Sequence, residues 1–307
     1  MDSIKVFSPG SVTNLSCGYD ILGFCLDKVG DTITVTKTSE KGIKISSIDK
    51  YNLPTSIDKN VAGIAAQAMM KDINLDYGFD IKIKKGIKPG SGIGSSAASS
   101  AGVVFAINKL IDSPFSDIEL IRFAMEGEKF VSGSYHADNV SPILLGGFTL
   151  VRSVKDLDII KLPNPKGLIA TIIRPEIELK TSDSRKVVKL KVTIDKMVQQ
   201  SANLAAFISS LYTEDYDLMS NSIVDEIIEP DRAILIPEFY NIKDISIKSG
   251  AIACGISGSG PAIFALSKSN KIANVILNKV SSHFNSVNIN YNGFVSIINS
   301  EGVKVID

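Results

Sequence analysis

The chain has 307 residues, 44% hydrophobic and 21% charged, which is the composition of a globular protein with a substantial core and room for two domains. Lys and Arg together number 33, as do Asp and Glu, so the zero formal charge argues against nucleic acid as a partner. No apolar run approaches the ~20 residues of a membrane span and the N-terminal residues lack a signal-peptide pattern, so we expect a cytoplasmic protein with no membrane partner.

The first predicted elements are two strands and a helix. The segment K-V-F-S-P-G predicts a short strand that stops at Pro9-Gly10. Asp31–Thr38 alternates as a half-buried strand does. Residues 60–71 are rich in alanine and predict a buried helix that begins at Asn60.

Next along the chain comes a strand that leads into a glycine-rich stretch. Residues 78–85 alternate, and P-G-S-G-I-G-S-S-A-A-S, Pro89–Ser99, follows them at once. An apolar helix continues over Ala97–Ile111, and a capping box at Ser116–Glu119 opens another helix. Lys161–Gly167, with two prolines and a glycine, predicts a domain boundary.

The second half repeats this mixture of strands and helices without a regular alternation. Because the strands and helices do not alternate regularly, the pattern favours two α+β domains over one doubly wound sheet. Its predicted elements are a strand at 168–175, helices at 194–211 and 214–228, two strands around a glycine turn at 250–266, a helix near 271–284 and a strand at 293–298.

The cysteines are expected to pack in the core. Cys17, Cys25 and Cys254 lie in apolar company, as buried thiols do. Three cysteines and two histidines show neither the spacing of a disulfide framework nor that of a zinc cluster.

The glycine-rich stretch has three interpretations. A flexible surface loop fits poorly, because an apolar helix follows directly. A Walker loop would have a lysine after Gly94, and a dinucleotide fingerprint would place its third glycine one residue later. The remaining interpretation is a loop whose backbone N–H groups, together with the positive end of the helix, bind phosphate. The hydroxyls of Ser95 and Ser96 could then reach a phosphate or its Mg²⁺.

A carboxylate is predicted on the buried face of the helix that follows Ser116. Ile118, Ile121 and Met125 form one apolar stripe, and Glu128 is the next position on it. Glu126 projects to roughly the opposite side, because each residue turns the helix by about 100°. A buried carboxylate needs an ionic partner, so Glu128 is expected to form a salt bridge or to bind a metal ion.

Several blocks of the sequence resemble one enzyme superfamily. The glycine-rich stretch is similar to P-x-G-x-G-L-G-S-S-A-[AS], the signature of the GHMP small-molecule kinases, with Ile93 in place of leucine. Ser8–Leu26 resembles the N-terminal motif of homoserine kinases and differs from that of galactokinases. Gly133–Phe148 is similar to the H-x-D-N-V-x-P block, and Glu229–Pro237 and Gly255–Pro261 also match, so the resemblance spans nearly the whole chain.

The resemblance implies a fold and an activity. The fold is α+β, with a ribosomal-S5-like ATP-binding domain over 1–163, a ferredoxin-like domain over 164–307 and the site between them. The activity is the phosphorylation of L-homoserine by ATP to O-phospho-L-homoserine in threonine biosynthesis, with Mg²⁺. The alternatives are a related kinase for a mevalonate-type hydroxy acid and a nucleotide-binding regulator without turnover; a homodimer is left open.

The resemblance also implies residues for ATP and its metal ion. Glu128 stands eight residues before His136, as the metal-binding glutamate of the family stands before its motif histidine. It would share Mg²⁺ with Ser95 or Ser96. The residues implied for ATP are Asn60, Pro89, Gly90, Ser91, Gly92, Ile93, Gly94, Ser95, Ser96, Ala97, Ala98 and Ser99. Asn60 could equally be a simple helix cap.

The remaining polar residues suit a small zwitterion. Asp20 and Asp138 could bind its ammonium group, and a guanidinium fork at Arg185 or Arg232 matches its carboxylate, although each arginine alone is typical of a surface ion pair. The implied substrate-binding residues are Asn14, Asp20, His136, Asp138, Asn139, Thr181, Arg185, Arg232 and Gly258.

Catalysis is assigned to Asn139, Asp20, Glu128 and Arg185. An amide cannot take a proton at neutral pH, so Asn139 would align the reactants. Asp20, Asp138 or no residue at all would be the general base.

Overall fold

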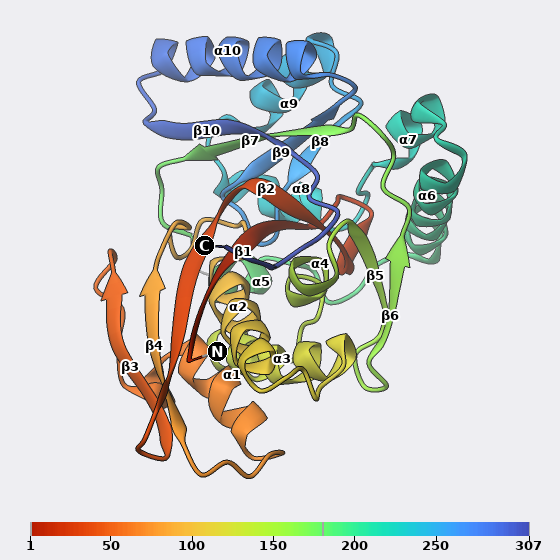
Figure 1. The fold of residues 1–307 in the computed structure, drawn as a ribbon. Helices are drawn as coiled ribbons and strands as arrows, with labels where there is room; N and C mark the ends of the chain where they lie inside the picture. Colours follow the sequence, from red (N-terminus) through yellow and green to blue (C-terminus); the bar gives the residue numbers. More distant parts are fainter. Residues whose placement is uncertain (1, 180, 307) are drawn as a thin grey trace.

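A computed structural model describes residues 2–179 and 181–306, without the side chains of Thr181 and Ser182 (Figure 1). Within these residues the first sheet has seven strands, ordered β11-β1-β2-β4-β3 with the β5–β6 hairpin paired to β2. The pairing is antiparallel except between β3 and β4. The strands are β1 (Ser3–Asn14), β2 (Gly18–Thr38), β3 (Gly42–Asp49), β4 (Gly78–Lys84), β5 (Phe148–Ser153), β6 (Asp158–Leu162) and β11 (Lys304–Val305).

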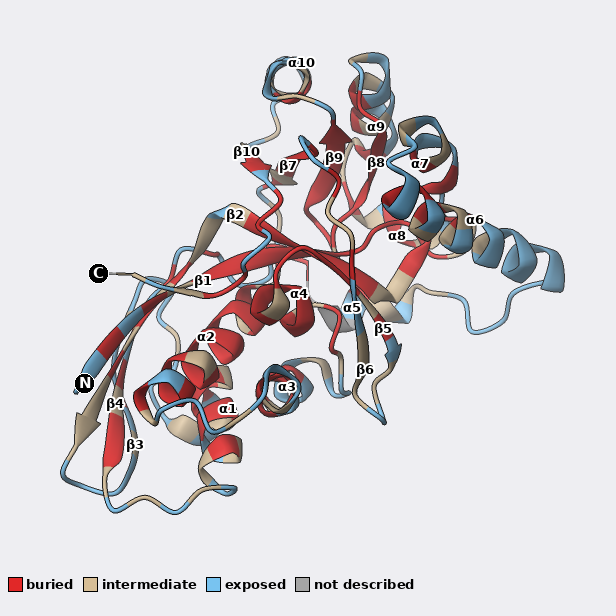
Figure 2. Ribbon diagram, turned by 45° about the vertical axis from the view of Figure 1, so that its right-hand side comes forward, coloured by how far each residue is buried: buried red, intermediate tan, exposed pale blue. Residues whose placement is uncertain are grey.

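Helices cover one face of this sheet. They are η1 (Ile57–Lys59), α1 (Val61–Met70), α2 (Ser95–Leu110), α3 (Asp117–Ser132) and α4 (Val140–Leu145). Figure 2 shows α2 almost wholly buried between the sheet and the other helices, because its apolar residues form most of its surface. The start of α2 is thereby held in a fixed place at the edge of the first core.

The second sheet has the order β10-β7-β9-β8. Its strands are β7 (Ile169–Pro175), β8 (Ala253–Ile256), β9 (Ile263–Ser267) and β10 (Tyr291–Ile297), and they pair antiparallel. Helices α9 (Phe239–Lys248) and α10 (Asn270–Ser286) pack on one face, where Phe239, Ile276 and Phe284 are buried. Strand order and connectivity are those of a ferredoxin-like βαββαβ unit, as predicted.

A helical segment connects β7 to β8. It comprises α5 (Thr181–Lys186), α6 (Ile194–Thr213), α7 (Tyr216–Ser222), α8 (Glu229–Arg232) and η2 (Ala233–Leu235). The ring of Phe207 on α6 lies 6.3 Å from that of Phe148 on β5, so this segment packs against the first core. The proposed boundary between 163 and 164 falls in the loop between the two sheets, while β11 pairs with β1 in the first sheet. Each half of the chain therefore contributes to the other's packing.

Most predicted elements are present, and three details are wrong. Strand β1 does not stop at Pro9-Gly10, because a register shift between Pro9 and Ser11 lets the ladder continue beyond the residue that lacks an N–H. The helix expected at 214–228 ends at Ser222. Ile118, expected on the buried stripe of α3, is 36% exposed because it lies in the first turn.

The early end of α7 has a local cause. The carboxylate of Asp225 accepts hydrogen bonds from the backbone N–H groups of Ile227, Ile228 and Glu229. These bonds form a turn that leads into α8.

Two further expectations concern the cysteines and membrane-spanning segments. All three cysteines are buried, as predicted. Among the described residues, no helix has both the length and the apolar character needed to cross a membrane.

Candidate active site

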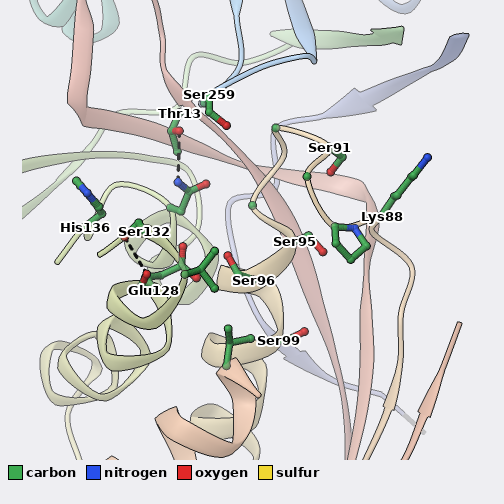
Figure 3. Close-up of a pocket in the computed structure, with 18 of the residues that line it drawn as sticks. Thr13, Lys88, Ser91, Ser95, Ser96, Ser99, Glu128, Ser132, His136 and Ser259 are labelled. Carbon is green, nitrogen blue, oxygen red and sulfur yellow. Dashed lines mark hydrogen bonds between the residues drawn. The ribbon is translucent and has the colours of Figure 1, made fainter. Parts of the chain in front are cut away.

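A cleft of about 600 Å³ opens between the two sheets (Figure 3). Its walls come from the β1–β2 turn, the glycine loop, α3, the start of α4, α5, α8 and the β8–β9 turn. The predicted residues that line it are Asn14, Asp20, Asn60, Pro89, Gly90, Ser91, Gly92, Gly94, Ser95, Ser96, Ser99, Glu128, His136, Asp138, Asn139, Arg185, Arg232 and Gly258. The fold thus brings residues from both halves of the chain into one site.

Three of the predicted residues that the structure describes do not line the cleft. Ile93, Ala97 and Ala98 are buried in the first core instead. The reason is that they occupy the inward side of the loop and of the first turn of α2. The side chain of Thr181 lies outside the described residues.

The glycine loop is built on left-handed backbone at three positions. Gly90, Gly92 and Gly94 have φ of +68°, +80° and +70°, a region that L side chains rarely adopt. A Cβ on Gly94 would lie 2.3 Å from the hydroxyl of Ser11. Gly94 is also the N-cap of α2 and supplies no side chain to its first N–H groups. Those donors are therefore available to an anion in the cleft.

Neighbouring strands hold this loop in place. The Ser257 hydroxyl donates to the Gly92 carbonyl at 2.6 Å, and the Ser11 N–H donates to the Ile93 carbonyl at 3.2 Å. The Ser95 hydroxyl donates to the Ile87 carbonyl at 2.9 Å, so it ties the end of the loop to its beginning. Of the two serines, Ser96 is the one whose hydroxyl bonds to Glu128.

Glu128 lies on the buried face of α3, as the helical spacing predicts. It is 8% exposed, and its Oε1 has no hydrogen-bond partner in the described part of the chain. Burial raises the pKa of Glu128 to about 7, against the opposing effects of the Ser96 hydrogen bond and the charge of Lys85. Glu126, by contrast, accepts a bond from Tyr135 at the exposed surface.

The oxygens at this end of the cleft fit a hard divalent cation. Figure 3 shows Glu128 and Ser96 side by side, facing each other from α3 and α2. The described residues contain no group of three or more acidic, His or Cys side chains that would enclose a metal ion. One carboxylate and one hydroxyl suit Mg²⁺, which usually takes its other ligands from water and phosphate.

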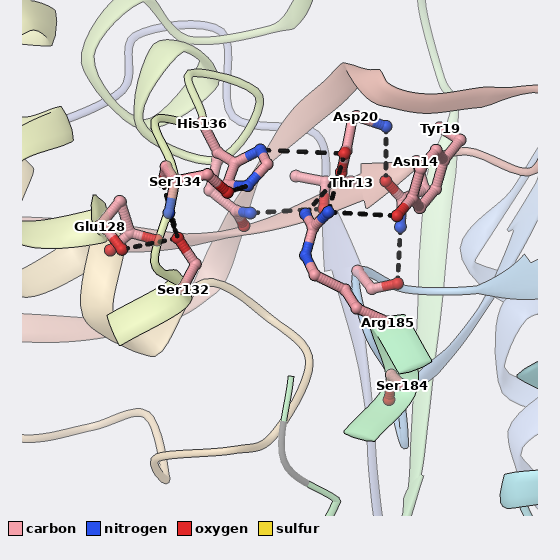
Figure 4. Close-up of polar contacts among 12 residues, drawn as sticks. Thr13, Asn14, Tyr19, Asp20, Glu128, Ser132, Ser134, His136, Ser184 and Arg185 are labelled. Atoms are coloured by element: carbon pink, nitrogen blue, oxygen red, sulfur yellow. Dashed lines mark hydrogen bonds and ion pairs between the residues drawn. The ribbon is translucent and has the colours of Figure 1, made fainter. Parts of the chain in front are cut away.

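At the other end of the cleft Asp20 and Arg185 form a bidentate pair (Figure 4). The guanidinium donates to the two carboxylate oxygens at 2.9 and 3.1 Å. His136 Nδ1 lies 3.9 Å from the same carboxylate, and burial lowers the pKa of His136. Asp20 has φ of +60°, and the turn before it is left-handed from Asn14 to Ser16. Such backbone is typical of functional sites.

Arg232 is 3% exposed and is held from three sides. Its guanidinium donates to the carbonyls of Ser184 and Gly258, both at 3.1 Å, and to the hydroxyl of Tyr19 at 3.2 Å. The same hydroxyl accepts from Arg185 at 3.3 Å, and both guanidinium groups lie over the tyrosine ring. Tyr19, which the sequence analysis missed, thereby keeps two cations together.

Asn139 and Asp138 lie between the two ends. The Asn139 amide oxygen accepts from the Ser11 hydroxyl at 2.8 Å, and its nitrogen donates to Thr13 Oγ1 at 3.4 Å. Asp138 is 3% exposed, and its Oδ1 lacks a hydrogen-bond partner among the residues described. Burial, then the nearby charges of Asp20 and Glu128, raise the pKa of Asp138 to about 7.

Asn60 caps α1, which agrees with the simpler of its two interpretations. Its Oδ1 accepts from the N–H groups of Ala62 and Gly63, and its Nδ2 donates to the Pro54 carbonyl at 2.8 Å. The cap nevertheless lies in the cleft wall beside an apolar region. The side chains of that region are Ile48, Leu53, Val61, Ile83 and Val131.

A buried ion pair behind the glycine loop was not predicted from the sequence. Lys85 and Asp31 have side chains that are 2% and 0% exposed. A signal for both existed, since Asp31 falls on the inward face of β2 and Lys85, directly after β4, continues the inward face of that strand. Lys85 is two residues after Ile83, and Asp31 is two residues before Ile33. Side chains two residues apart in a strand point to the same face of the sheet, so each charged residue shares the face of a buried isoleucine.

The chain matches known protein families along most of its length. The GHMP kinases N terminal domain matches residues 60–147 and the GHMP kinases C terminal domain matches residues 206–286. A homoserine kinase of Chlorobium phaeobacteroides (strain BS1) is 36% identical and one of Methanococcus vannielii is 38% identical. The alignment covers all of both chains in the first case, and 90% of this chain and 91% of the relative in the second.

Solved structures agree with this match. The homoserine kinase of Cytophaga hutchinsonii ATCC 33406 is 42% identical, with a TM-score of 0.96 over 100% of this chain and 98% of that one. A mevalonate kinase structure, 18% identical with a TM-score of 0.71, shares the fold. The chain therefore belongs to the GHMP kinase superfamily and, within it, to the homoserine kinases.

Proposed function

We propose that this protein transfers the γ-phosphoryl group of ATP to the hydroxyl of L-homoserine, in threonine biosynthesis in the cytoplasm. One observation carries the proposal beyond family membership. The cleft joins a phosphate-type glycine loop to a second end with two buried or half-buried arginines and two carboxyl groups. A nucleotide and a small zwitterion with a carboxylate and an ammonium group match these two ends.

The nucleotide would occupy the end formed by the glycine loop. The uncapped N–H groups at the start of α2 and the left-handed glycines would face the phosphate chain. The apolar wall that includes Leu53 and Val131 would contact the adenine. Glu128 and Ser96 would hold Mg²⁺, whose charge neutralises phosphate oxygens when it is bound.

The amino acid would occupy the other end. Arg185 and Arg232 would bind its carboxylate, and the unpartnered buried Nε of Arg185 is a donor still available for this contact. Asp20 or Asp138 would take the ammonium group. Because Arg185 already pairs with Asp20, the bound carboxylate would share the guanidinium with that aspartate.

The reaction forms a bond from the homoserine hydroxyl oxygen to the γ-phosphorus and breaks the bond from that phosphorus to the ADP oxygen. The protein contributes positioning and charge neutralisation. Asn139, fixed by Ser11 and Thr13, would orient the hydroxyl. The pKa of the buried Asp138 carboxyl is raised to about 7, which suits a proton acceptor at neutral pH.

A panel of substrate analogues tests the proposal. ADP release is measured with L-homoserine, with homoserinol, which lacks the carboxylate, and with 4-hydroxybutyrate, which lacks the ammonium group. We expect both analogues to lose at least roughly tenfold in kcat/KM, because each leaves buried charges of the site unpaired. Analogues as good as homoserine would contradict the assignment of this end of the cleft.

A further inference from the structure

A buried cluster of side chains behind the glycine loop connects the two ends of the loop. It consists of Asp31 on β2, Lys85 directly after β4, and Ser99 in the second turn of α2, and we call these three residues the buried clamp. The Lys85 ammonium donates to Asp31 and, at 2.9 Å each, to the Ser99 hydroxyl and the Ser95 carbonyl. The Ser99 hydroxyl in turn donates to Asp31 at 2.7 Å. All three donors of the ammonium are therefore in use.

The clamp contacts the loop on both sides. On the entering side, Asp31 Oδ1 accepts the N–H groups of Gly86 and Ile87 at 3.0 and 3.3 Å. On the leaving side, Lys85 holds the carbonyl of Ser95, the first residue of α2. The ion pair thus joins the chain before the phosphate-binding turn to the chain after it. Residues 88–94 lie between these two contacts, and within this segment Ser257 and Ser11 also donate to the carbonyls of Gly92 and Ile93.

Stability alone is a poor explanation for such a pair. Desolvation makes a fully buried ion pair about as favourable as well-packed apolar residues, or less so. The surrounding first core could accommodate apolar side chains at both positions, since Ile83 and Ile33 beside them are buried. Apolar residues at these positions could not form hydrogen bonds with the N–H groups of Gly86 and Ile87 or with the Ser95 carbonyl.

We propose that the buried clamp is a positioning device that fixes the glycine loop in its phosphate-binding shape before nucleotide arrives. The inference rests on the proposed function, because it takes the phosphates of ATP as the ligand of the loop. Lys85 acts through the Ser95 carbonyl and Asp31 through two backbone N–H groups. A loop held in this way loses little conformational entropy on binding, so its contribution appears as nucleotide affinity.

The test removes the link that the ion pair makes between the two sides and keeps the other link, the Ser95 hydroxyl bond to the Ile87 carbonyl. In Lys85→Met/Asp31→Asn the buried charges disappear together, and the amide oxygen at 31 still accepts from Gly86 and Ile87. The bond to the Ser95 carbonyl is lost. Val280→Ala is the matched control for a loss of stability, because Val280 lies on the buried face of α10 in the second core and does not line the cleft.

ADP affinity is measured by calorimetry in EDTA, so that no metal ion contributes, and KM is measured for both substrates. We expect the double variant to bind ADP roughly tenfold more weakly and to show a similar rise in the KM for ATP, with the KM for homoserine changed less than about twofold. Val280→Ala should lower Tm while leaving the ADP affinity within about twofold of wild type.

The outcomes separate the inference from the proposed function. Failure of the wild type to bind ADP would overturn the proposed function, and the inference with it. A wild type that binds ADP, beside a folded double variant of equal affinity, would overturn the clamp alone. If the double variant does not fold, Lys85→Met takes its place, because this single change also removes the bond to the Ser95 carbonyl, and wild-type ADP affinity in that variant would refute the clamp in the same way.

Discussion

Replacing Glu128 with Gln is expected to stabilise the protein at pH 8 while removing most of its activity. The carboxyl group is 8% exposed and its pKa is raised to about 7 from 4.5, mainly by burial. At ~1.36 kcal/mol per pKa unit, ionisation of this group lowers the free energy of unfolding by about 3 kcal/mol. A neutral amide of the same shape avoids that loss.

The sign follows from the two protonation equilibria. As pH rises, the unfolded chain releases the proton near pH 4.5 and the folded chain releases it only near pH 7. Between these values the folded state binds more protons, so the stability of the wild type falls as pH rises and reaches its full loss above the folded pKa. Glu128→Gln lacks this dependence. Its advantage over the wild type should therefore be small at pH 5 and largest at pH 8.

Urea unfolding in EDTA, from pH 5 to pH 8, measures the difference in the free energy of unfolding between the wild type and Glu128→Gln. Comparison at equal pH removes most of the contribution of Asp138, which is present in both. Glu126→Gln is the control, because that side chain lies at the exposed surface and its removal should cost less than about 0.5 kcal/mol at any pH. A stability difference independent of pH, or equal loss of activity in the two variants, would refute the assignment of Glu128.

The other predictions concern affinity and the pH dependence of turnover. Arg185→Ala and Arg232→Ala should each raise the KM for homoserine roughly 10- to 100-fold with little change for ATP, and equal losses with homoserinol would show that the arginines do not bind the carboxylate. Gly94→Ala should weaken ADP binding more than Gly90→Ala, because an added Cβ meets a hydroxyl at 2.3 Å in the first case, whereas in the second the nearest atom is a carbonyl oxygen at 3.8 Å; calorimetry giving equal losses would argue against this packing. At saturating Mg²⁺, which keeps Glu128 ionised, Asp138→Asn should abolish the rise of kcat with pH near pH 7, since the pKa of that carboxyl is about 7; a pH profile that keeps this limb would exclude Asp138 as the base.

Local patterns predicted those features whose causes are local. The spacing along α3 placed Glu128 on the buried face because helical geometry fixes that face over several turns. Ile118 has the same helical spacing but is exposed, since the first turn of α3 extends past the edge of the core. The strand stop expected at Pro9 failed because a shift in register absorbs the missing donor.

Contacts between residues that are far apart in the sequence could not be predicted from local sequence patterns. Tyr19 meets Arg185 and Arg232, which are 166 and 213 residues further along the chain. Lys85 and Asp31 did leave a trace, as charges on the inward faces of strands, but their pairing depends on the register that joins β2 to β4. The predicted roles of the site residues remain proposals, whereas the fold and the family follow from the structure and the matches together.

The most direct test of the proposed activity is to identify the product. The purified protein is incubated with ATP and Mg²⁺ and with either L-homoserine or mevalonate, and the new phosphate ester is measured by ³¹P NMR and mass spectrometry. We expect O-phospho-L-homoserine, and a kcat/KM for homoserine at least roughly 100-fold above that for mevalonate, because only the amino acid pairs the carboxyl groups of the cleft. Phosphorylation of mevalonate at an equal or higher kcat/KM, or no O-phospho-L-homoserine at all, would contradict the proposal.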